Sequence, residues 1–141
     1  MRSPACGGFE VDAGVVSGLG LIGPTTGGAG GIGYTAIQLA KAFGAYVFTT
    51  VAGPDQIEAV KKLGADVALD YATQDWAREI ENLVGRRGID CILDFVGGAY
   101  IQKNLKLLAR NGRLVQIAFM QGAKVELDLS LIHISEPTRP Y

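Results

Sequence analysis

Residues 26–51 read TGGAGGIGYTAIQLAKAFGAYVFTTV and carry the strongest indication of the fold in the chain. The glycines at positions 28, 30 and 33 have the spacing G-x-G-x-x-G and open into residues 30–44, whose apolar side chains recur at helical spacing. Residues 45–51 are β-branched and aromatic without a break, which is typical of a strand buried on both faces of a parallel sheet. A glycine loop, a helix and a buried strand in this order predict a nucleotide-binding α/β domain.

The same alternation continues along the chain. We expect a helix over 55–63 with Asp55 as its N-cap, a strand over 66–69, a helix over 74–84, a strand over 89–96, a helix over 100–109 and a strand over 113–119. A turn at Asn111-Gly112 separates the last two elements. Strands and helices in strict alternation predict a doubly wound parallel sheet of the Rossmann type, covered by helices on both faces.

Composition narrows the class of protein. The 141 residues are enough for one domain, and 48% hydrophobic with 19% charged residues argues against disorder. A net charge of -1 with scattered Lys and Arg gives no basic field, so we expect no nucleic-acid partner. The apolar runs are far shorter than the ~20 residues of a membrane helix, and no signal peptide is evident, so we expect a cytoplasmic protein without membrane contact.

The glycine loop is the main candidate site. A pyrophosphate can lie against a helix N-terminus only where no side chain blocks the backbone N–H groups, which favours glycine. The candidate cofactor-binding residues in the loop are Gly28, Gly30, Gly31, Ile32 and Gly33. A glycine-rich turn without a ligand is the alternative. Tyr34 and Thr35 follow the last glycine where a nucleotide triphosphatase needs Gly-Lys-Ser/Thr, which excludes that class.

The second predicted strand indicates which cofactor binds. NAD-preferring domains carry an acidic residue about 20 residues beyond the loop, where it accepts hydrogen bonds from the ribose hydroxyls. No acid occurs in residues 49–53, and its absence favours NADPH over NADH. The Tyr-x-x-x-Lys pair of short-chain dehydrogenases is absent, which excludes that family, and no Cys/His cluster has zinc spacing.

From Gly27 to Leu127 the chain resembles the nucleotide-binding domain of quinone oxidoreductases, the zeta-crystallin-like branch of the medium-chain dehydrogenase/reductases. The resemblance lies in GGAGGIGYTAIQLAKAFGA, KKLGADVALDY, ILDFVGG and GRLVQIA, which occur in the order that this branch uses. It implies a zinc-independent enzyme that transfers a hydride from NADPH to a quinone or an activated alkene, such as an enone.

The resemblance also implies further contacts with the cofactor. Gly53 would make room for the adenosine ribose, and Tyr71 stands where the family has a tyrosine that holds the 2′-phosphate. Gln56 replaces the usual lysine, which weakens the preference for NADPH and leaves NADH acceptable. The contacts expected near the nicotinamide are Val96, Gly97, Phe119 and Met120. Asp94 precedes this loop inside an apolar strand, so we expect a structural role with backbone partners and assign no catalytic residue.

The two ends of the chain do not match the family. Residues 1–26 are either an out-of-frame translation or a divergent segment that contributes a strand at 18–22. Residues 129–139, LSLIHISEPTR, resemble the translation of a transposase adaptor used to prepare DNA libraries, and a genuine tail is the alternative. These boundaries leave residues 27–128 as a single truncated cofactor domain without the family's catalytic domain.

Such a fragment is expected to bind nucleotide without turning over a substrate. A homodimer formed through sheet edges would follow the family pattern. A Rossmann-like binding or methyltransferase domain without redox activity is the alternative function, although the second strand lacks the acid that ends it in methyltransferases. A third interpretation is that the loss of the first central strand prevents stable folding.

Overall fold

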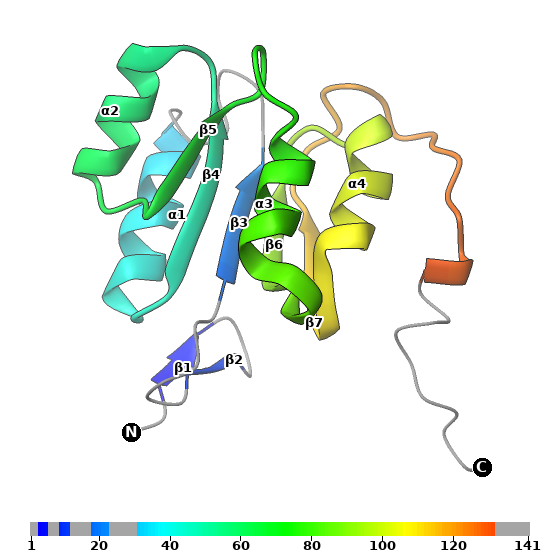
Figure 1. Cartoon of the computed structure of the whole chain (residues 1–141), viewed down its shortest axis with the longest axis horizontal. Helices are drawn as coiled ribbons and strands as arrows, with labels where there is room; N and C mark the ends of the chain where they lie inside the picture. Colours follow the sequence, from blue (N-terminus) through cyan, green and yellow to red (C-terminus); the bar gives the residue numbers. More distant parts are fainter. Residues whose placement is uncertain (1–2, 6–8, 12–17, 23–30, 132–141) are drawn as a thin grey trace.

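The computed structural model describes the backbone of residues 3–5, 9–11 and 18–22 and the whole of residues 31–131. Strands β3 to β7 form a parallel sheet in the order β5-β4-β3-β6-β7, and β1 and β2 form a separate antiparallel pair (Figure 1). The elements are β1 (Ser3–Ala5), β2 (Phe9–Val11), β3 (Gly18–Ile22), α1 (Gly31–Ala42), β4 (Tyr46–Val51), α2 (Pro54–Lys62), β5 (Val67–Asp70), α3 (Trp76–Val84), a 3₁₀ turn (Gly85–Arg87), β6 (Ile89–Asp94), α4 (Ala99–Leu107) and β7 (Leu108–Gln116). The predicted doubly wound Rossmann-type fold is confirmed.

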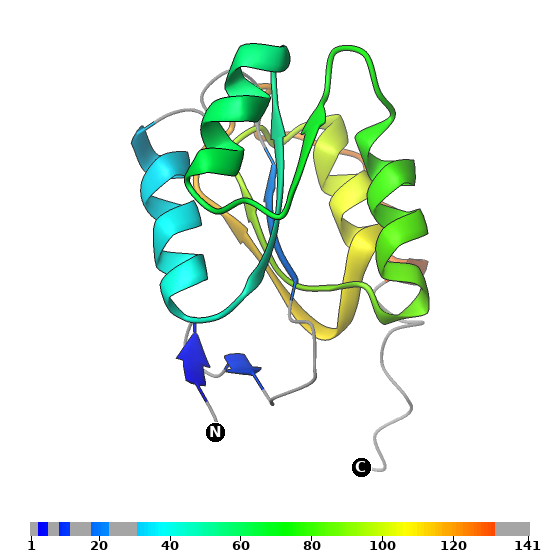
Figure 2. The ribbon, with the colours of Figure 1, turned by 60° about the vertical axis from the view of Figure 1, so that its left-hand side comes forward.

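Helices cover both faces of the sheet, as Figure 2 shows. One buried core contains Ile37 of α1 and Val60 of α2 together with Val47 of β4. The other contains Ile80 of α3 and Phe48 of β4. Because successive strand residues point to opposite faces, the neighbours Val47 and Phe48 enter different cores. Strand β4 is therefore buried on both sides, as its unbroken apolar sequence predicts.

Strand β3 lies at the centre of the sheet. Leu21 pairs with Thr49 of β4 on one side and with Leu93 of β6 on the other, both in parallel. The interpretation of residues 1–26 as a divergent segment includes a strand at 18–22, where β3 lies. That these residues are translated out of frame stays a prediction. From β3 the chain proceeds to β4 and β5, then crosses to β6 on the opposite side. This reversal creates the crevice at which ligands bind in open α/β sheets.

The start of α2 differs from the prediction. Its N-cap is Gly53 and Pro54 occupies the first turn, so the expectation that Asp55 is the N-cap was wrong. Proline suits the first helical position because its fixed φ is helical and its missing N–H has no partner there. Gly53 has φ 81°, a backbone conformation that glycine adopts without strain.

The junction of α4 and β7 also differs. The helix ends at Leu107 and the strand already begins at Leu108, which pairs with Ile89. The prediction that a turn at Asn111-Gly112 separates the helix from the strand was wrong: both residues lie inside β7, where Asn111 has φ 62° and the pairing register shifts. Strands β6 and β7 end at Asp94 and Gln116 respectively, earlier than predicted, because the residues that follow fold into loops.

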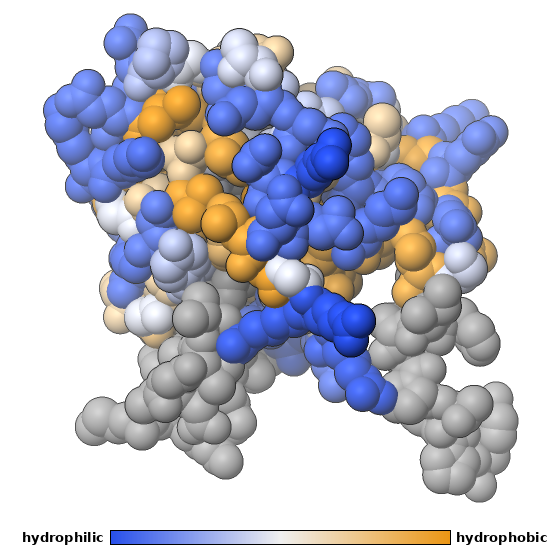
Figure 3. Space-filling model, viewed as in Figure 1, coloured by the Kyte–Doolittle hydropathy of each residue, from blue (hydrophilic) through white to orange (hydrophobic). Residues whose placement is uncertain are grey.

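The surface carries both polar and apolar groups. On the face seen in Figure 3, hydrophilic residues predominate and apolar residues appear in separate patches. Helix α1 exposes Ile32 and Leu39 while it buries Ile37 and Ala40, and Phe43 directly after the helix is also exposed. Within the described residues, no helix has the length and apolar character needed to cross a membrane.

Candidate nucleotide-binding site

The parallel strands all end at one edge of the sheet, the upper edge in Figure 1. Three groups of predicted site residues follow these strand ends. The first is the start of α1. The second comprises residues 52–56, which include the first turn of α2, and residues 71–75; we name these segments the β4–β5 loops. The third comprises residues 95–98 and 117–122, which we name the β6–β7 loops. Because β3 lies between β4 and β6, this strand separates the second group from the third.

The start of α1 offers unobstructed backbone. Gly31 is its first residue, and a Cβ added there would meet nothing within 4 Å. Gly33 is buried and Ile32 is 58% exposed. The first N–H groups of a helix have no partner within it and attract anions, so this end of α1 has room for a phosphate. Gly28 and Gly30 lie outside the described residues.

The β4–β5 loops bring Gly53, Gln56 and Tyr71 together. A Cβ at Gly53 would meet nothing within 4 Å, so space is open beside this backbone. Gln56 turns towards the end of β4, where its Oε1 accepts a hydrogen bond from the Ala52 backbone N–H at 3.0 Å. The backbone N–H of Tyr71 donates to the Val51 carbonyl at 3.1 Å, which joins the two loops.

Asp70 places a carboxylate at this end of the site. Its Oδ1 accepts a hydrogen bond from the Ala72 backbone N–H at 2.9 Å. Hydrogen bonds from Ala72, and further ones from Thr73 and the Gly53 backbone, hold the pKa of Asp70 below its usual value. Residues 49–53, at the end of β4, contain no acid. The neighbouring strand supplies one, and it stays charged at neutral pH.

The β6–β7 loops pack against each other. The Gln121 N–H donates to the Val96 carbonyl at 2.8 Å. Gly97 and Gly98 have φ 68° and 56°, and a Cβ would lie 3.1 Å from the Gly122 carbonyl oxygen or 2.9 Å from the Gln121 Cβ, respectively. Val96 is fully buried, whereas Phe119 and Met120 are 55% and 56% exposed. The structure thus brings the four predicted nicotinamide contacts to one place, two beneath the surface and two on it.

A buried polar cluster supports these loops from below. Asp94 is fully buried at the end of β6, and its Oδ1 accepts hydrogen bonds from the backbone N–H groups of Val96 at 2.6 Å and Gly97 at 3.2 Å. Its Oδ2 accepts from Asn104 Nδ2 at 2.9 Å. Burial raises the pKa of Asp94, and these hydrogen bonds oppose that rise. The backbone partners are those that the sequence analysis expects.

Asn104 and Gln116 complete this cluster, and sequence reasoning missed both. Gln116 Nε2 donates to the Ala118 carbonyl at 2.6 Å and to the Asp94 carbonyl at 3.3 Å. Asn104 is fully buried on α4, three residues before the buried Leu107. A polar residue three positions from an apolar one lies on the same face of a helix, and this spacing was the available signal.

A metal site would require a different set of side chains. Among residues 31–131 and the short strands before them, no group of three or more His, Cys, Asp or Glu could hold a metal ion. Cys91 is buried in the core that contains Ile37. Independence from zinc stays a prediction.

Comparison with known proteins identifies the family. The model of the zinc-binding dehydrogenase family matches residues 31–138. The chain is 36% identical over 62 residues to 2-haloacrylate reductase of Burkholderia sp., a match that covers 44% of this chain and 19% of the relative. It is 50% identical over 52 residues to the chloroplast envelope quinone oxidoreductase homolog of Arabidopsis thaliana, which covers 37% of this chain and 16% of the relative.

A solved structure agrees with these matches. Mycobacterial Rv1454c complexed with NADPH superimposes with a TM-score of 0.71 and 29% identity over 90% of this chain and 40% of that one. The chain thus spans less than half of the length of these relatives. The family match does not favour a methyltransferase or another domain without redox activity. The chain belongs to the zinc-binding dehydrogenase family, within the medium-chain dehydrogenase/reductase superfamily.

Proposed function

We propose that this chain is the dinucleotide-binding part of a zeta-crystallin-like quinone oxidoreductase and that it binds NADPH, with NADH as a weaker ligand. One observation carries this proposal: the start of α1, the β4–β5 loops and the β6–β7 loops line one edge of the sheet on both sides of β3. A dinucleotide is a long ligand with a central pyrophosphate, and it binds across such a reversal of strand order.

Each group of residues would hold one part of the ligand. The backbone at Gly28, Gly30 and the start of α1 would bind the pyrophosphate. Gly53 would admit the adenosine ribose, because nothing occupies the space beside it, and Gln56 and Tyr71 would lie at the 2′-phosphate. The nicotinamide would lie against the β6–β7 loops, where Phe119 and Met120 are exposed.

In the whole enzyme the reaction would be reduction of a quinone or an activated alkene such as an enone. The bound cofactor supplies the hydride, while the protein orients it and excludes competing reactions. This chain's residues bind and position; we assign none of them a catalytic role. We propose that the enzyme needs no zinc, which agrees with the absence of a metal-ligand group among the described residues. A homodimer and a cytoplasmic location stay predictions.

Asp70 bears on the choice between NADPH and NADH. Its carboxylate is charged at neutral pH and receives a hydrogen bond from the Gly53 backbone. A negative charge there repels a 2′-phosphate, and the lysine that would compensate is replaced by Gln56. Both features weaken the preference for NADPH that the lack of an acid in residues 49–53 favours, so we expect that preference to be modest.

Titration of the purified 141-residue chain with NADPH and NADH, followed by nucleotide fluorescence, tests this proposal. Circular dichroism of the same sample reports whether the chain is folded. The proposal predicts saturable binding of both nucleotides, with NADPH tighter. A folded chain that binds neither nucleotide would contradict it.

A further inference from the structure

Two fully buried polar side chains, Asp94 and Asn104, and the partly buried Gln116 meet at the carboxyl end of β6, from three different elements. Asp94 ends β6, Asn104 lies in α4, and Gln116 ends β7. Asn104 Oδ1 and Gln116 Oε1 are buried and have no hydrogen-bond partner. Burying such atoms is unfavourable, so the fold retains this cluster at a cost that simple core packing would avoid.

The cluster's bonds run into the β6–β7 loops. Asp94 Oδ1 receives the N–H groups of Val96 and Gly97, which fixes the first loop where it leaves the strand. Gln116 Nε2 bonds to the Ala118 carbonyl in the second loop and also to the Asp94 carbonyl. One set of contacts therefore sets the conformation of both loops and their separation.

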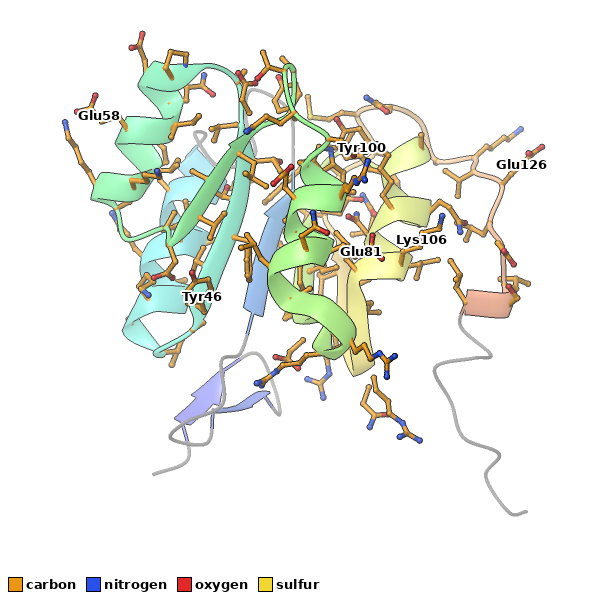
Figure 4. The ribbon with its side chains drawn as sticks, in the orientation of Figure 1. Tyr46, Glu58, Glu81, Tyr100, Lys106 and Glu126 are labelled. Atoms are coloured by element: carbon orange, nitrogen blue, oxygen red, sulfur yellow. The ribbon has the colours of Figure 1, made fainter. Side chains whose placement is uncertain are left out.

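Besides this cluster, backbone hydrogen bonds from Gln121 to the Val96 carbonyl and from Ile117 to the Asp94 carbonyl hold the loops, whose outer residues are exposed. Phe119 and Met120 are more than half exposed, and both Gly97 and Gly98 have positive φ angles. A loop of this kind keeps one conformation when groups beneath it are locked by packing and hydrogen bonds. Figure 4 shows Tyr100 on the first turn of α4, at the end of the helix that adjoins these loops.

We propose that Asp94, Asn104 and Gln116 are positioning residues, which hold the β6–β7 loops in the conformation that receives the nicotinamide half of the dinucleotide. This inference rests on the proposed function, because it assigns these loops to that half of the ligand. Displacement of a binding group by about 1 Å is enough to weaken a site severely. Loss of the cluster should therefore weaken binding of the nicotinamide half alone.

The affinities for two ligands distinguish a loss of loop positioning from a general loss of stability. NADPH carries both halves, whereas adenosine 2′,5′-bisphosphate carries only the adenosine half. A variant that merely destabilises the fold weakens both ligands together. A variant that displaces the β6–β7 loops weakens NADPH and spares adenosine 2′,5′-bisphosphate, because the β4–β5 loops lie on the other side of β3.

The test uses an exchange of the two partners. In Asp94→Asn, the Asn104 amide has to turn over so that its Oδ1 faces the new amide N–H, which disturbs the cluster; Asn104→Asp places two carboxylates together instead. The double variant Asp94→Asn/Asn104→Asp restores one donor and one acceptor. Gln116→Met removes the link between the loops and keeps the side-chain length. Glu81→Gln on the exposed face of α3 is the matched carboxylate control.

We expect each single variant to weaken NADPH binding about tenfold or more and adenosine 2′,5′-bisphosphate less than about twofold, with much of the loss recovered in the double variant. If Asp94→Asn or Asn104→Asp fails to fold, as judged by circular dichroism, the affinities of Gln116→Met and of the double variant for the two ligands test the inference instead. A parent chain that binds no nucleotide overturns the proposed function and this inference together. A parent that binds NADPH, with folded variants that bind it equally well, overturns this inference alone. Equal weakening of both ligands would also overturn it.

Discussion

Asp70 and Asp94 end two parallel strands in the same way and in opposite surroundings. Each carboxylate accepts a hydrogen bond from the backbone N–H two residues further on, Ala72 for Asp70 and Val96 for Asp94. Asp70 is at the surface, and these bonds lower its pKa, whereas Asp94 is fully buried and desolvation raises its pKa. The same turn therefore places the charged Asp70 carboxylate next to the β4–β5 loops and the buried, hydrogen-bonded Asp94 carboxylate beneath the β6–β7 loops.

The difference separates two tasks within one site. A surface carboxylate changes how well a charged ligand is accepted, and its loss disturbs little else. A buried carboxylate that satisfies three donors cannot be removed without leaving those donors unpaired. We expect substitutions at the β4–β5 loops to change cofactor preference and substitutions at the β6–β7 loops to change stability and fit.

The largest contrast is expected from alanine at the two aspartates. Asp94→Ala leaves the N–H groups of Val96 and Gly97 and the Asn104 amide without their acceptor. It should lower the free energy of unfolding by about 3 kcal/mol, measured by urea denaturation. Asp70→Ala should shift the urea midpoint only slightly. Equal midpoints for the two variants would refute the contrast.

Glycines at the two ends of the site give the next contrast. Gly98→Ala and Gly53→Ala both place an L-residue at positive φ, which costs roughly 1 kcal/mol of stability. Only at Gly98 does the new Cβ also meet a neighbour, the Gln121 Cβ at 2.9 Å. We expect Gly98→Ala to be the more destabilising by about 1–2 kcal/mol in the same assay. If Gly53→Ala unfolds more readily than Gly98→Ala, the close contact between Gly98 and Gln121 in the β6–β7 loops would be contradicted.

The ratio of NADPH to NADH affinity tests the role proposed for the surface carboxylate of Asp70. Asp70→Asn removes the negative charge near the place proposed for the 2′-phosphate and should raise the ratio of NADPH to NADH affinity, by up to about fivefold. Gln56→Lys, which adds a cation, should change the ratio in the same direction. Nucleotide fluorescence titration measures both. A ratio unchanged in both variants would remove these residues from the proposed 2′-phosphate site.

The pH dependence of stability should have opposite signs at the two aspartates, and this is the smallest effect expected. Because the folded pKa of Asp94 is raised, its contribution is present below the unfolded pKa near 3.8 and is lost as pH rises through the folded value. Because the folded pKa of Asp70 is lowered, its contribution is present above 3.8 and is lost as pH falls through the folded value.

Urea midpoints of the parent, Asp94→Asn and Asp70→Asn between pH 3 and 7 measure these slopes. Relative to the parent, Asp94→Asn should lose less stability as pH rises, and Asp70→Asn should lose less as pH falls below 3.8. Variants with the same pH profile as the parent would contradict the assigned surroundings.

The sequence predicts the fold well wherever local patterns decide it. The run of β-branched and aromatic residues before Gly53 predicts β4, and the helical spacing of apolar residues after the glycine loop predicts α1. Local patterns fail where tertiary contacts decide. Pairing of Leu108 with Ile89 ends α4 early, and Pro54 moves the start of α2 ahead of Asp55.

The sequence motifs of the site were predictable, but the polar residues that surround and hold its loops were not. Glycine spacing points to the start of α1, and the family resemblance points to the loops at the strand ends. Asp70 approaches Gly53 from a neighbouring strand, so no spacing along one strand reveals it. Asn104 and Gln116 meet Asp94 only because α4 and β7 fold back beside β6, which is a property of the topology.

Hydrogen–deuterium exchange of the 141-residue chain, with and without NADPH, measures whether one dinucleotide contacts all three groups of residues. If one dinucleotide lies across the sheet edge, amides at the start of α1, in residues 52–56 and 71–75, and in residues 95–98 and 117–122 should all exchange more slowly with NADPH present. Protection confined to one side of β3, or absent from every one of these segments, would contradict the account.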